Sequence, residues 1–322
     1  MSTPQPTALA PTRAHLARNL LVYGLFGLFA AWCIVGFRRD IAQIDLAPLQ
    51  SGWHAVLLAG LLSLVNYALR VARWQLYLRR LGHHLPWGFV SLTFMAGFAF
   101  TLSPGKLGEM VRARYYQPRG IPVSSVTAAF FVERLLDLLA MILLAAAVLT
   151  ELKAYQSFLW VAVALVGGLL AMLALVPWPR VQALLDGRPH GAVLKLAQGV
   201  VHMLSSARQF LTPGLLCTGL AMGLLAWGLE AVGLKLVGDV ISATPLPLAS
   251  AMGIYSVAII VGALSFLPGG LGSTEAVMAA LLYAHGYTMP QAILLTLVCR
   301  LLTLWLAVLI GWVCVALLRR AP

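Results

Sequence analysis

Residues 126–150 read VTAAFFVERLLDLLAMILLAAAVLT, an apolar run of 25 residues that carries three charged side chains. About 20 apolar residues are enough for a helix to cross the hydrocarbon core of a bilayer. The run is rich in Leu and Ala and shows no polar-apolar alternation, which favours a helix over a barrel strand. We therefore expect this stretch to cross a membrane as a helix that holds charges inside the bilayer.

The rest of the chain has the same character. Of the 322 residues, 61% are hydrophobic and 10% are charged, whereas soluble domains contain roughly 25% charged residues. Long apolar runs recur from Leu20 to Leu318. Backbone groups in hydrocarbon must be paired inside helices or a closed barrel. The predicted fold class is therefore all-α, a polytopic helical membrane protein.

The formal charge of +12 arises from 22 Lys and Arg against 10 Asp and Glu. Basic residues collect in the cytoplasmic loops of membrane proteins, so this excess needs no nucleic-acid partner. The seven histidines and four cysteines show no metal-ligand spacing. We expect no nucleic acid, no metal and no cofactor.

The positions of Lys and Arg also predict the topology. Residues 1–19 are expected to form a cytoplasmic tail before an uncleaved signal anchor. Arg319 and Arg320 place the C-terminus in the cytoplasm as well, which predicts a multi-pass protein of the bacterial inner membrane. The cluster that begins at Arg70 and Arg73 is assigned to the cytoplasm. The six predicted crossing helices are 20–37, 53–69, 126–150, 158–176, 215–237 and 291–318.

Two further apolar runs end at Pro-Gly turns. Residues 87–102 lead into SPGKLGE at 103–109, and residues 248–267 lead into LPGGLGSTE at 267–275. A complete crossing by 87–102 would leave the following arginines outside the cell or in lipid. A re-entrant hairpin removes this conflict, since irregular backbone is tolerated at that depth where protein or water surrounds it. We expect two re-entrant helical hairpins.

The two turns belong to an internal repeat. Each contains Pro-Gly-x-Leu-Gly followed by a glutamate, Glu109 or Glu275, and an arginine follows that glutamate after 25 residues, at Arg134 or Arg300. We interpret residues 20–318 as one transmembrane domain. Its parts are repeat one (about 53–150), a basic cytoplasmic linker along the interface (about 179–211) and repeat two (about 215–318). The charge topology makes the repeats inverted, as in many transporters.

Three charges within one predicted helix require partners. Each costs roughly 2.5–3.5 kcal/mol near the bilayer centre on insertion scales. Glu133 and Asp137 share a helical face, and Arg134 lies about 100° away, so we expect Arg134 not to satisfy both acids. The candidate external partners are Arg70, Arg73 and Lys106.

Two interpretations of this cluster stay open. It is either a structural clamp or a polar cavity that accepts an anionic headgroup or couples to protons. Glu109 and Glu275 are either helix-capping acids or a protonatable pair. Glu230 and Asn66 are weaker candidates within helices.

Taken together, the motifs resemble the lysylphosphatidylglycerol synthase transmembrane-region family over roughly residues 20–318. The resemblance implies a flippase-like protein, similar to the flippase part of the multiple peptide resistance factors. The chain ends at Pro322 without the soluble aminoacyl-transfer domain of full-length synthases, so we expect it not to make lysyl-lipids itself. The matching motifs are Arg70-x-x-Arg73-Trp74, Pro104–Glu109, Glu133-Arg134-x-x-Asp137 and Pro268–Glu275.

The prediction is a transport protein and not an enzyme, which moves a phospholipid or lipid-linked anionic molecule between leaflets. The alternatives are an intramembrane lipid-modifying transferase, or a non-catalytic membrane partner of a cytoplasmic or membrane enzyme in lipid or glycan synthesis. The oligomeric state is left open. The candidate binding or translocation residues are Arg70, Arg73, Lys106, Glu109, Glu133, Arg134, Asp137, Glu275 and Arg300. The candidate hairpin-turn residues are Pro104, Gly105, Gly108, Pro268, Gly269, Gly270 and Gly272.

Overall fold

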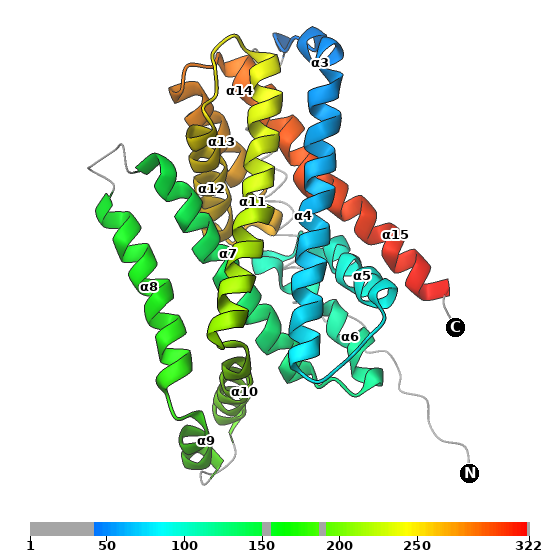
Figure 1. Ribbon diagram of the computed structural model, residues 1–322, viewed down its shortest axis with the longest axis vertical. Coiled ribbons are helices and arrows are strands. Elements are labelled where there is room, and N and C mark those ends of the chain that lie inside the picture. The colour runs from blue at the N-terminus through cyan, green and yellow to red at the C-terminus, as the bar shows by residue number, and fades with distance from the viewer. Residues whose placement is uncertain (1–41, 150–155, 187–190, 321–322) are drawn as a thin grey trace, which may run out of the picture. The chain divides into compact units, whose positions relative to one another are not determined.

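Two long helices, α4 (Trp53–Arg80) and α11 (Pro213–Ile241), pack side by side in the computed structural model (Figure 1). The structure describes residues 42–149, 156–186 and 191–320, and the elements below all lie in the unit Asp45–Pro322. Glycines let the two helices approach closely: a Cβ added to Gly233 of α11 would lie 3.3 Å from the Cβ of Ala59. Small residues at such contacts stabilise membrane helix pairs by close backbone packing.

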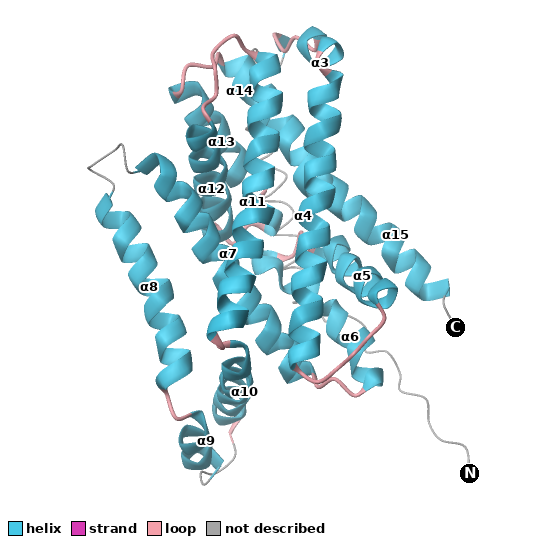
Figure 2. Cartoon of the chain, viewed as in Figure 1, coloured by secondary structure: helices cyan, strands magenta, loops and turns pink. Residues whose placement is uncertain are grey.

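Within the described residues the chain forms helices and no strands, as Figure 2 shows. α4, α11 and the continuous stretch Met289–Arg320 are long and apolar enough to cross a membrane, with 28, 29 and 32 residues. The stretch Met289–Arg320 consists of α14 (Met289–Arg300), the π-helix η7 (Leu301–Trp305) and α15 (Leu306–Arg320). The all-α polytopic prediction is confirmed.

The remaining predicted crossings have different outcomes. α8 (Gln156–Leu175) is followed after a 73° bend by α9 (Trp178–Asp186), and together they count as one further span. α7 (Val123–Leu149) has 27 residues but carries the three charges of the Glu133–Asp137 segment. The predicted helix 20–37 and the tail 1–19 lie outside the described residues. Length and composition alone thus support three or four crossings in the described part of the chain, where five of the six predicted helices lie.

The segment 179–211 is largely helical. Besides α9 it contains α10 (Ala192–Ala207), which packs against both α9 and α7. Val201 and Ala207 of α10 are buried in the core cluster. The linker expected along the interface therefore consists mainly of helices that pack on the rest of the unit.

The first Pro-Gly turn lies in a hairpin with short helical arms. Its entering arm is α5 (Trp87–Ala96) followed by the 3₁₀ helix η1 (Gly97–Phe100). Fourteen residues at about 1.5 Å per residue cannot cross a bilayer core about 30 Å thick. Its returning arm is the 3₁₀ helix η2 (Pro104–Val111), the five-residue α6 (Arg112–Tyr116) and η3 (Gln117–Arg119). The expected returning α-helix is therefore wrong for this hairpin.

The second hairpin is more regular. α12 (Leu248–Leu264) leads to the turn η6 (Pro268–Gly270) and the 12-residue α13 (Ser273–Ala284). The two hairpins come from opposite ends of the unit and their turns, η2 and η6, touch (Figure 1). A Cβ added to Gly269 would lie 2.7 Å from the side chain of Leu102, so the contact depends on glycine.

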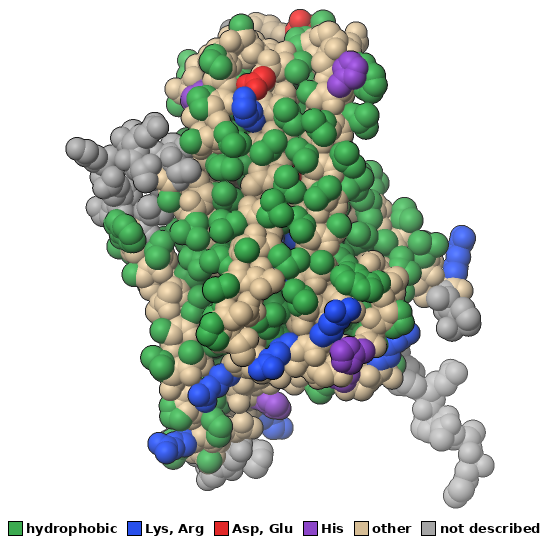
Figure 3. Space-filling model, viewed as in Figure 1, with side chains coloured by type: hydrophobic (Ala, Val, Ile, Leu, Met, Phe, Trp, Pro, Cys, Tyr) green, Lys and Arg blue, Asp and Glu red, His purple; other side chains and the backbone are tan. Residues whose placement is uncertain are grey.

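The surface has the pattern of a membrane protein (Figure 3). Hydrophobic side chains form a broad band on the face shown, and Lys and Arg gather towards the end where α9 and α10 lie. Large apolar residues are exposed on the outer faces of α4 and α15, among them Leu57, Leu61, Leu309 and Val313. Such side chains are stable in contact with lipid and costly in contact with water.

Candidate functional site

The basic residues that were assigned to a cytoplasmic cluster after residue 69 divide into two groups. α4 continues to Arg80, and only its last turn carries the exposed Arg79 and Arg80. Arg70 and Arg73 lie inside the helix and are 6% and 1% exposed. The cytoplasmic assignment of these two residues is therefore wrong, because helical periodicity turns them towards α7 and away from water.

Glu133 on α7 is the centre of a buried charge cluster. Its carboxylate lies within 4.0 Å of four arginines, at 3.6 Å from Arg70, 3.4 Å from Arg73, 3.6 Å from Arg112 and 2.7 Å from Arg134. Buried charges are stable only when paired and hydrogen-bonded. The arginines supply this pairing from α4, the first hairpin and α7 itself.

Asp137 is paired from two sides. Arg73 Nη2 donates to its Oδ1 at 2.6 Å, and Arg134 Nη2 lies 3.2 Å from its Oδ2. Arg134 therefore contacts both Glu133 and Asp137, and the expectation that it could not is wrong. The arginine side chain is long enough to run along the helix surface, so its guanidinium reaches Asp137, three residues further along the chain.

Glu109 joins the cluster from the first hairpin. Its carboxylate lies 3.1 Å from Arg112, 3.9 Å from Arg70 and 4.0 Å from Arg134, and it accepts a hydrogen bond of 2.9 Å from Thr101. It sits in the middle of η2 and caps no helix. The structure thus favours charge pairing over capping for Glu109.

Sequence reasoning missed Arg112. Its guanidinium is fully buried and lies 4.3 Å from the ring centroid of Trp74 and 4.6 Å from that of Phe94. Arginine is the cation best suited to such flat stacking. The spacing Glu109-x-x-Arg112 was the available signal, since residues three apart on one helical turn are neighbours.

The second repeat holds a smaller version of this arrangement. Arg300 Nε donates to Glu275 at 2.6 Å, and Arg300 Nη2 donates to the Gly269 carbonyl at 2.8 Å. Glu275 also accepts from the Gly272 backbone N–H at 2.6 Å, so it does cap α13. Arg300 thereby ties the second hairpin turn to α14.

The repeat is visible in these contacts. Glu109 and Arg134 approach to 4.0 Å, and the equivalent Glu275 and Arg300 approach to 2.6 Å. Two pairs at equal spacing in the sequence thus both bring an arginine near a glutamate, although only Arg300 and Glu275 form a hydrogen bond. This supports the interpretation of the two segments as related units.

Backbone geometry at the turns repeats as well. Lys106 has φ of +56°, and the residue at the same position of the second motif, Gly270, has φ of +67°. A non-glycine residue in this region costs roughly 1–2 kcal/mol. The first turn thus carries the side chain of Lys106 at the position where the second turn has Gly270 and no side chain. Gly269 and Gly272 are also left-handed, and Gly108 donates its N–H to Ser103 Oγ at 2.5 Å.

Lys106 is the one basic residue of the site without a carboxylate partner. Among the described residues no Asp or Glu lies within 4.0 Å of its ammonium group. The ammonium nitrogen lies 5.7 Å from the ring centroid of Trp227 on α11. Pro104 and Gly105 precede it in η2 and contribute the turn.

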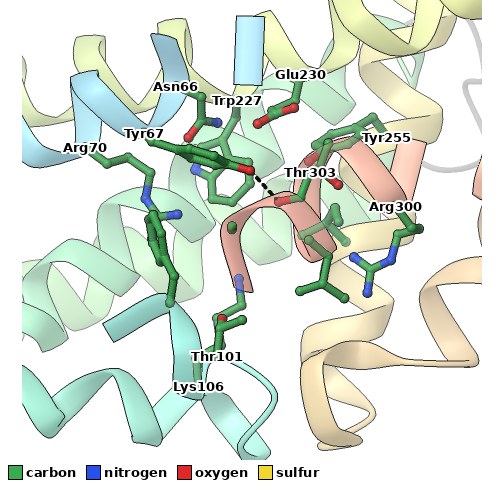
Figure 4. Close-up of a pocket in the computed structure, with 14 residues that line it drawn as sticks. Asn66, Tyr67, Arg70, Thr101, Lys106, Trp227, Glu230, Tyr255, Arg300 and Thr303 are labelled. Carbon is green, nitrogen blue, oxygen red and sulfur yellow. Dashed lines mark hydrogen bonds between the residues drawn. The ribbon is translucent and has the colours of Figure 1, made fainter. Parts of the chain in front are cut away.

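Lys106 projects into a cavity of about 50 Å³ that we name the central cavity (Figure 4). Arg70 and Arg300 lie on two sides of it, and Glu230 lies across from Lys106. Several buried polar atoms on its wall make no hydrogen bond to the described protein: Arg70 Nε and Nη2, Trp227 Nε1, Asn66 Oδ1 and Thr303 Oγ1. The central cavity is lined by Asn66, Tyr67, Arg70, Phe98, Thr101, Lys106, Trp227, Glu230, Tyr255, Ile259, Arg300, Thr303, Leu304 and Ala307.

A second cavity adjoins the first. It has about 310 Å³ and is mostly apolar, and we name it the apolar cavity. α7 contributes Leu138 and Met141, and α12 contributes Ile260 and Leu264. Arg134 and Asp137 line it where it meets the charge cluster. The residues that line both cavities are Lys106, Trp227, Ile259, Arg300 and Leu304.

The predicted site residues therefore fall into two connected groups. Arg73, Glu109, Glu133 and Asp137 belong to the charge cluster, which Arg70 and Arg134 link to the cavities. Lys106 and Arg300 stand where the cavities meet. No group of three His, Cys, Asp or Glu side chains with metal-binding geometry occurs in the described part of the chain.

Comparison with known proteins places the chain in a family. A search of curated proteins found no match. The family profile described as "Lysylphosphatidylglycerol synthase TM region" matches residues 19–311, which cover both hairpins, the charge cluster and both cavities. The chain is thus a multi-pass membrane protein that belongs to the lysylphosphatidylglycerol synthase transmembrane-region family, a family tied to lipid modification or transport.

Proposed function

We propose that the protein binds a lipid with an anionic headgroup in its two adjoining cavities and moves that lipid between the leaflets of the bacterial inner membrane. The observation that carries this proposal is the position of Lys106. It is an unpaired cation at the boundary between a polar cavity and an apolar one. A lipid is divided in the same way, into a polar headgroup and apolar acyl chains.

The charge balance favours an anion. Four arginines (70, 73, 112 and 134) face three acids (109, 133 and 137) in the cluster, which leaves one positive charge in excess. Lys106 adds another, and Arg70 presents two buried nitrogens without a hydrogen bond. A phosphate can accept several charge-assisted hydrogen bonds from such donors.

The apolar cavity suits the hydrocarbon part. Its lining from α7 and α12 is formed mainly by Leu, Ile and Met side chains. An acyl chain that moves from the bilayer into this cavity exchanges one apolar environment for another, so it contributes little binding free energy. Affinity and specificity would then depend on the headgroup contacts in the central cavity.

Movement between leaflets is proposed to follow from the two hairpins. They enter from opposite ends of the unit and their turns meet beside Lys106 and Arg300. Inverted units that rock around a fixed midplane site are the general design of secondary transporters. We therefore propose a transporter and not an enzyme.

Exchange of a fluorescent anionic lipid between liposome leaflets tests the proposal. The variant is Lys106→Met, which removes an unpaired positive charge without breaking an ion pair. One charge-assisted hydrogen bond contributes about 1.5–3 kcal/mol, so we expect exchange to slow about 10- to 100-fold. The matched control is Lys235→Met, at an exposed pair with Asp239 near the end of α11.

The outcomes separate the alternatives. Exchange by Lys106→Met equal to that by Lys235→Met would contradict the role of the cavities. Exchange by the wild type equal to that of protein-free liposomes would contradict translocation altogether. Formation of a modified lipid by the purified protein would instead support a transferase. Mass spectrometry of the lipids that co-purify identifies the headgroup.

A further inference from the structure

Glu230 on α11 is a buried acid outside the charge cluster. It is 3% exposed, and its one hydrogen bond is accepted from Ser63 Oγ at 2.7 Å. No Lys, Arg or His of the described chain lies within 4.0 Å of it. The other acids classed as buried, Glu109, Glu133 and Asp137, each contact at least two arginines.

Glu230 lines the central cavity, and charged or titratable groups face that region from every neighbouring element. α4 contributes Tyr67 and Arg70, α12 contributes Tyr255, and the first hairpin contributes Lys106. α14 contributes Arg300 to the same cavity and Cys299 to a small adjoining one. Glu230 therefore lines the same cavity as three cations but pairs with none of them.

A carboxylate in this position depends on the cavity cations. In a medium of low polarity a buried charge is strongly unfavourable unless an opposite charge lies nearby. Lys106 and Arg70 supply positive potential across the empty cavity. An anionic headgroup that bound to these cations would cancel that potential and repel a charged Glu230.

We propose that Glu230 is a proton-binding site and that the central cavity takes up an anionic headgroup and a proton together. This inference rests on the proposed function, since it requires the headgroup to bind there. Because linkage is reciprocal, a proton on Glu230 raises the affinity for the anion as much as the anion raises the affinity for the proton. Each lipid monoanion then enters with one proton, so the pair carries no net charge across the bilayer.

Binding measurements across pH test the coupling. The probe is fluorescent phosphatidylglycerol added to detergent-solubilised protein, with phosphatidylcholine as the zwitterionic comparison. The sign follows from the linkage: binding is strong where Glu230 is protonated and weakens as pH rises. One repelled charge gives at least about a tenfold loss of affinity for the wild type between about pH 6 and about pH 9.

Glu230→Gln is the decisive variant, because it keeps the size and the acceptor for Ser63 and mimics the protonated acid. We expect its affinity to be constant over the same pH range and equal to that of the wild type at low pH. Lys106, Cys299 and the tyrosines are all retained in this variant, so a constant affinity assigns the dependence to Glu230. Asp239→Asn, an acid-to-amide change at a half-exposed position, is the matched control and should keep the wild-type profile.

Proton uptake gives a second measurement. On binding the lipid in weak buffer, the wild type should take up close to one proton per lipid near the midpoint of the affinity profile, and Glu230→Gln none. If Glu230→Gln does not fold, Ser63→Ala keeps the carboxyl, removes its hydrogen-bond donor and should move that midpoint.

The possible results distinguish the proton coupling, its assignment to Glu230 and the proposed function. Wild-type binding that is independent of pH and takes up no proton would overturn the coupling and leave the anion site intact. An unmoved midpoint in Ser63→Ala, or an unchanged profile in Glu230→Gln, would overturn the assignment to Glu230. No binding of phosphatidylglycerol in preference to phosphatidylcholine at any pH would overturn the proposed function itself.

Discussion

Glu133→Gln should be among the most damaging single changes in the charge cluster. The amide keeps the shape of the side chain but removes the one negative charge that all four arginines contact, at 2.7–3.6 Å. The cluster would then hold four arginines and two acids. Two unit charges 4 Å apart interact by about 4 kcal/mol at an effective dielectric constant of 20. Part of this is offset by the cost of burying the charge, and breaking a buried pair costs about 3–5 kcal/mol in practice.

The matched control is Asp239→Asn, the same acid-to-amide change in an exposed pair. Asp239 and its partner Lys235 are 37% and 33% exposed, so we expect about 0–1 kcal/mol there. The assay is the free energy of unfolding in mixed micelles, followed by tryptophan fluorescence against denaturant concentration. We expect Glu133→Gln to lose about 3–5 kcal/mol relative to the wild type.

A double variant tests the physical reason. Adding Arg73→Met to Glu133→Gln removes one surplus positive charge, so the two losses should combine to less than their sum by about 1 kcal/mol or more. The reasoning is refuted if Glu133→Gln costs no more than Asp239→Asn. It is refuted equally if the two changes add without coupling, since Glu133 would then not compensate the arginines.

Three further changes test the packing around the site. Tyr67→Phe removes the hydroxyl that donates to two carbonyls of the π-helix η7 at 3.2 and 2.9 Å, and should cost about 1 kcal/mol in the same unfolding assay. Arg300→Met releases the second hairpin turn from α14, and hydrogen exchange in η6 should rise while that in α9 stays unchanged; equal exchange of η6 in the wild type and the variant would contradict the tie. Gly311→Leu places a side chain against the backbone of Ala99, and the overpacking should lower stability by about 1–3 kcal/mol, whereas an unchanged midpoint would show that α15 does not pack closely on η1.

Several features of the site could be predicted from the sequence. Glu133 and Asp137 lie in an apolar helix, where charges must be paired, so the sequence predicted cationic partners for them. Arg70 and Arg73 are two of these partners. The 25-residue spacing that relates Glu109 to Arg134 and Glu275 to Arg300 indicated an internal repeat but predicted no contact. In the structure the first pair lies 4.0 Å apart and the second 2.6 Å.

Other features could not be predicted because they depend on distances between helices. Arg112 was not among the candidate site residues, since a charge that follows a turn normally faces water. The fold instead encloses it between the rings of Trp74 and Phe94. Glu230 was ranked below the hairpin acids. It stands out because the other buried acids of the described chain, Glu109, Glu133 and Asp137, all lie beside arginines.

The sequence by itself determined that the chain is helical, that it crosses a membrane and that charged residues lie within its apolar segments. These follow from composition and from the cost of unpaired groups in hydrocarbon, which act locally along the chain. Only the tertiary structure decided which charges neutralise each other and which remain available. That outcome depends on contacts of a few ångströms between α4, α7 and the two hairpins, and Lys106 and Glu230 are left facing one cavity because no opposite charge comes within 4.0 Å of either in the described chain.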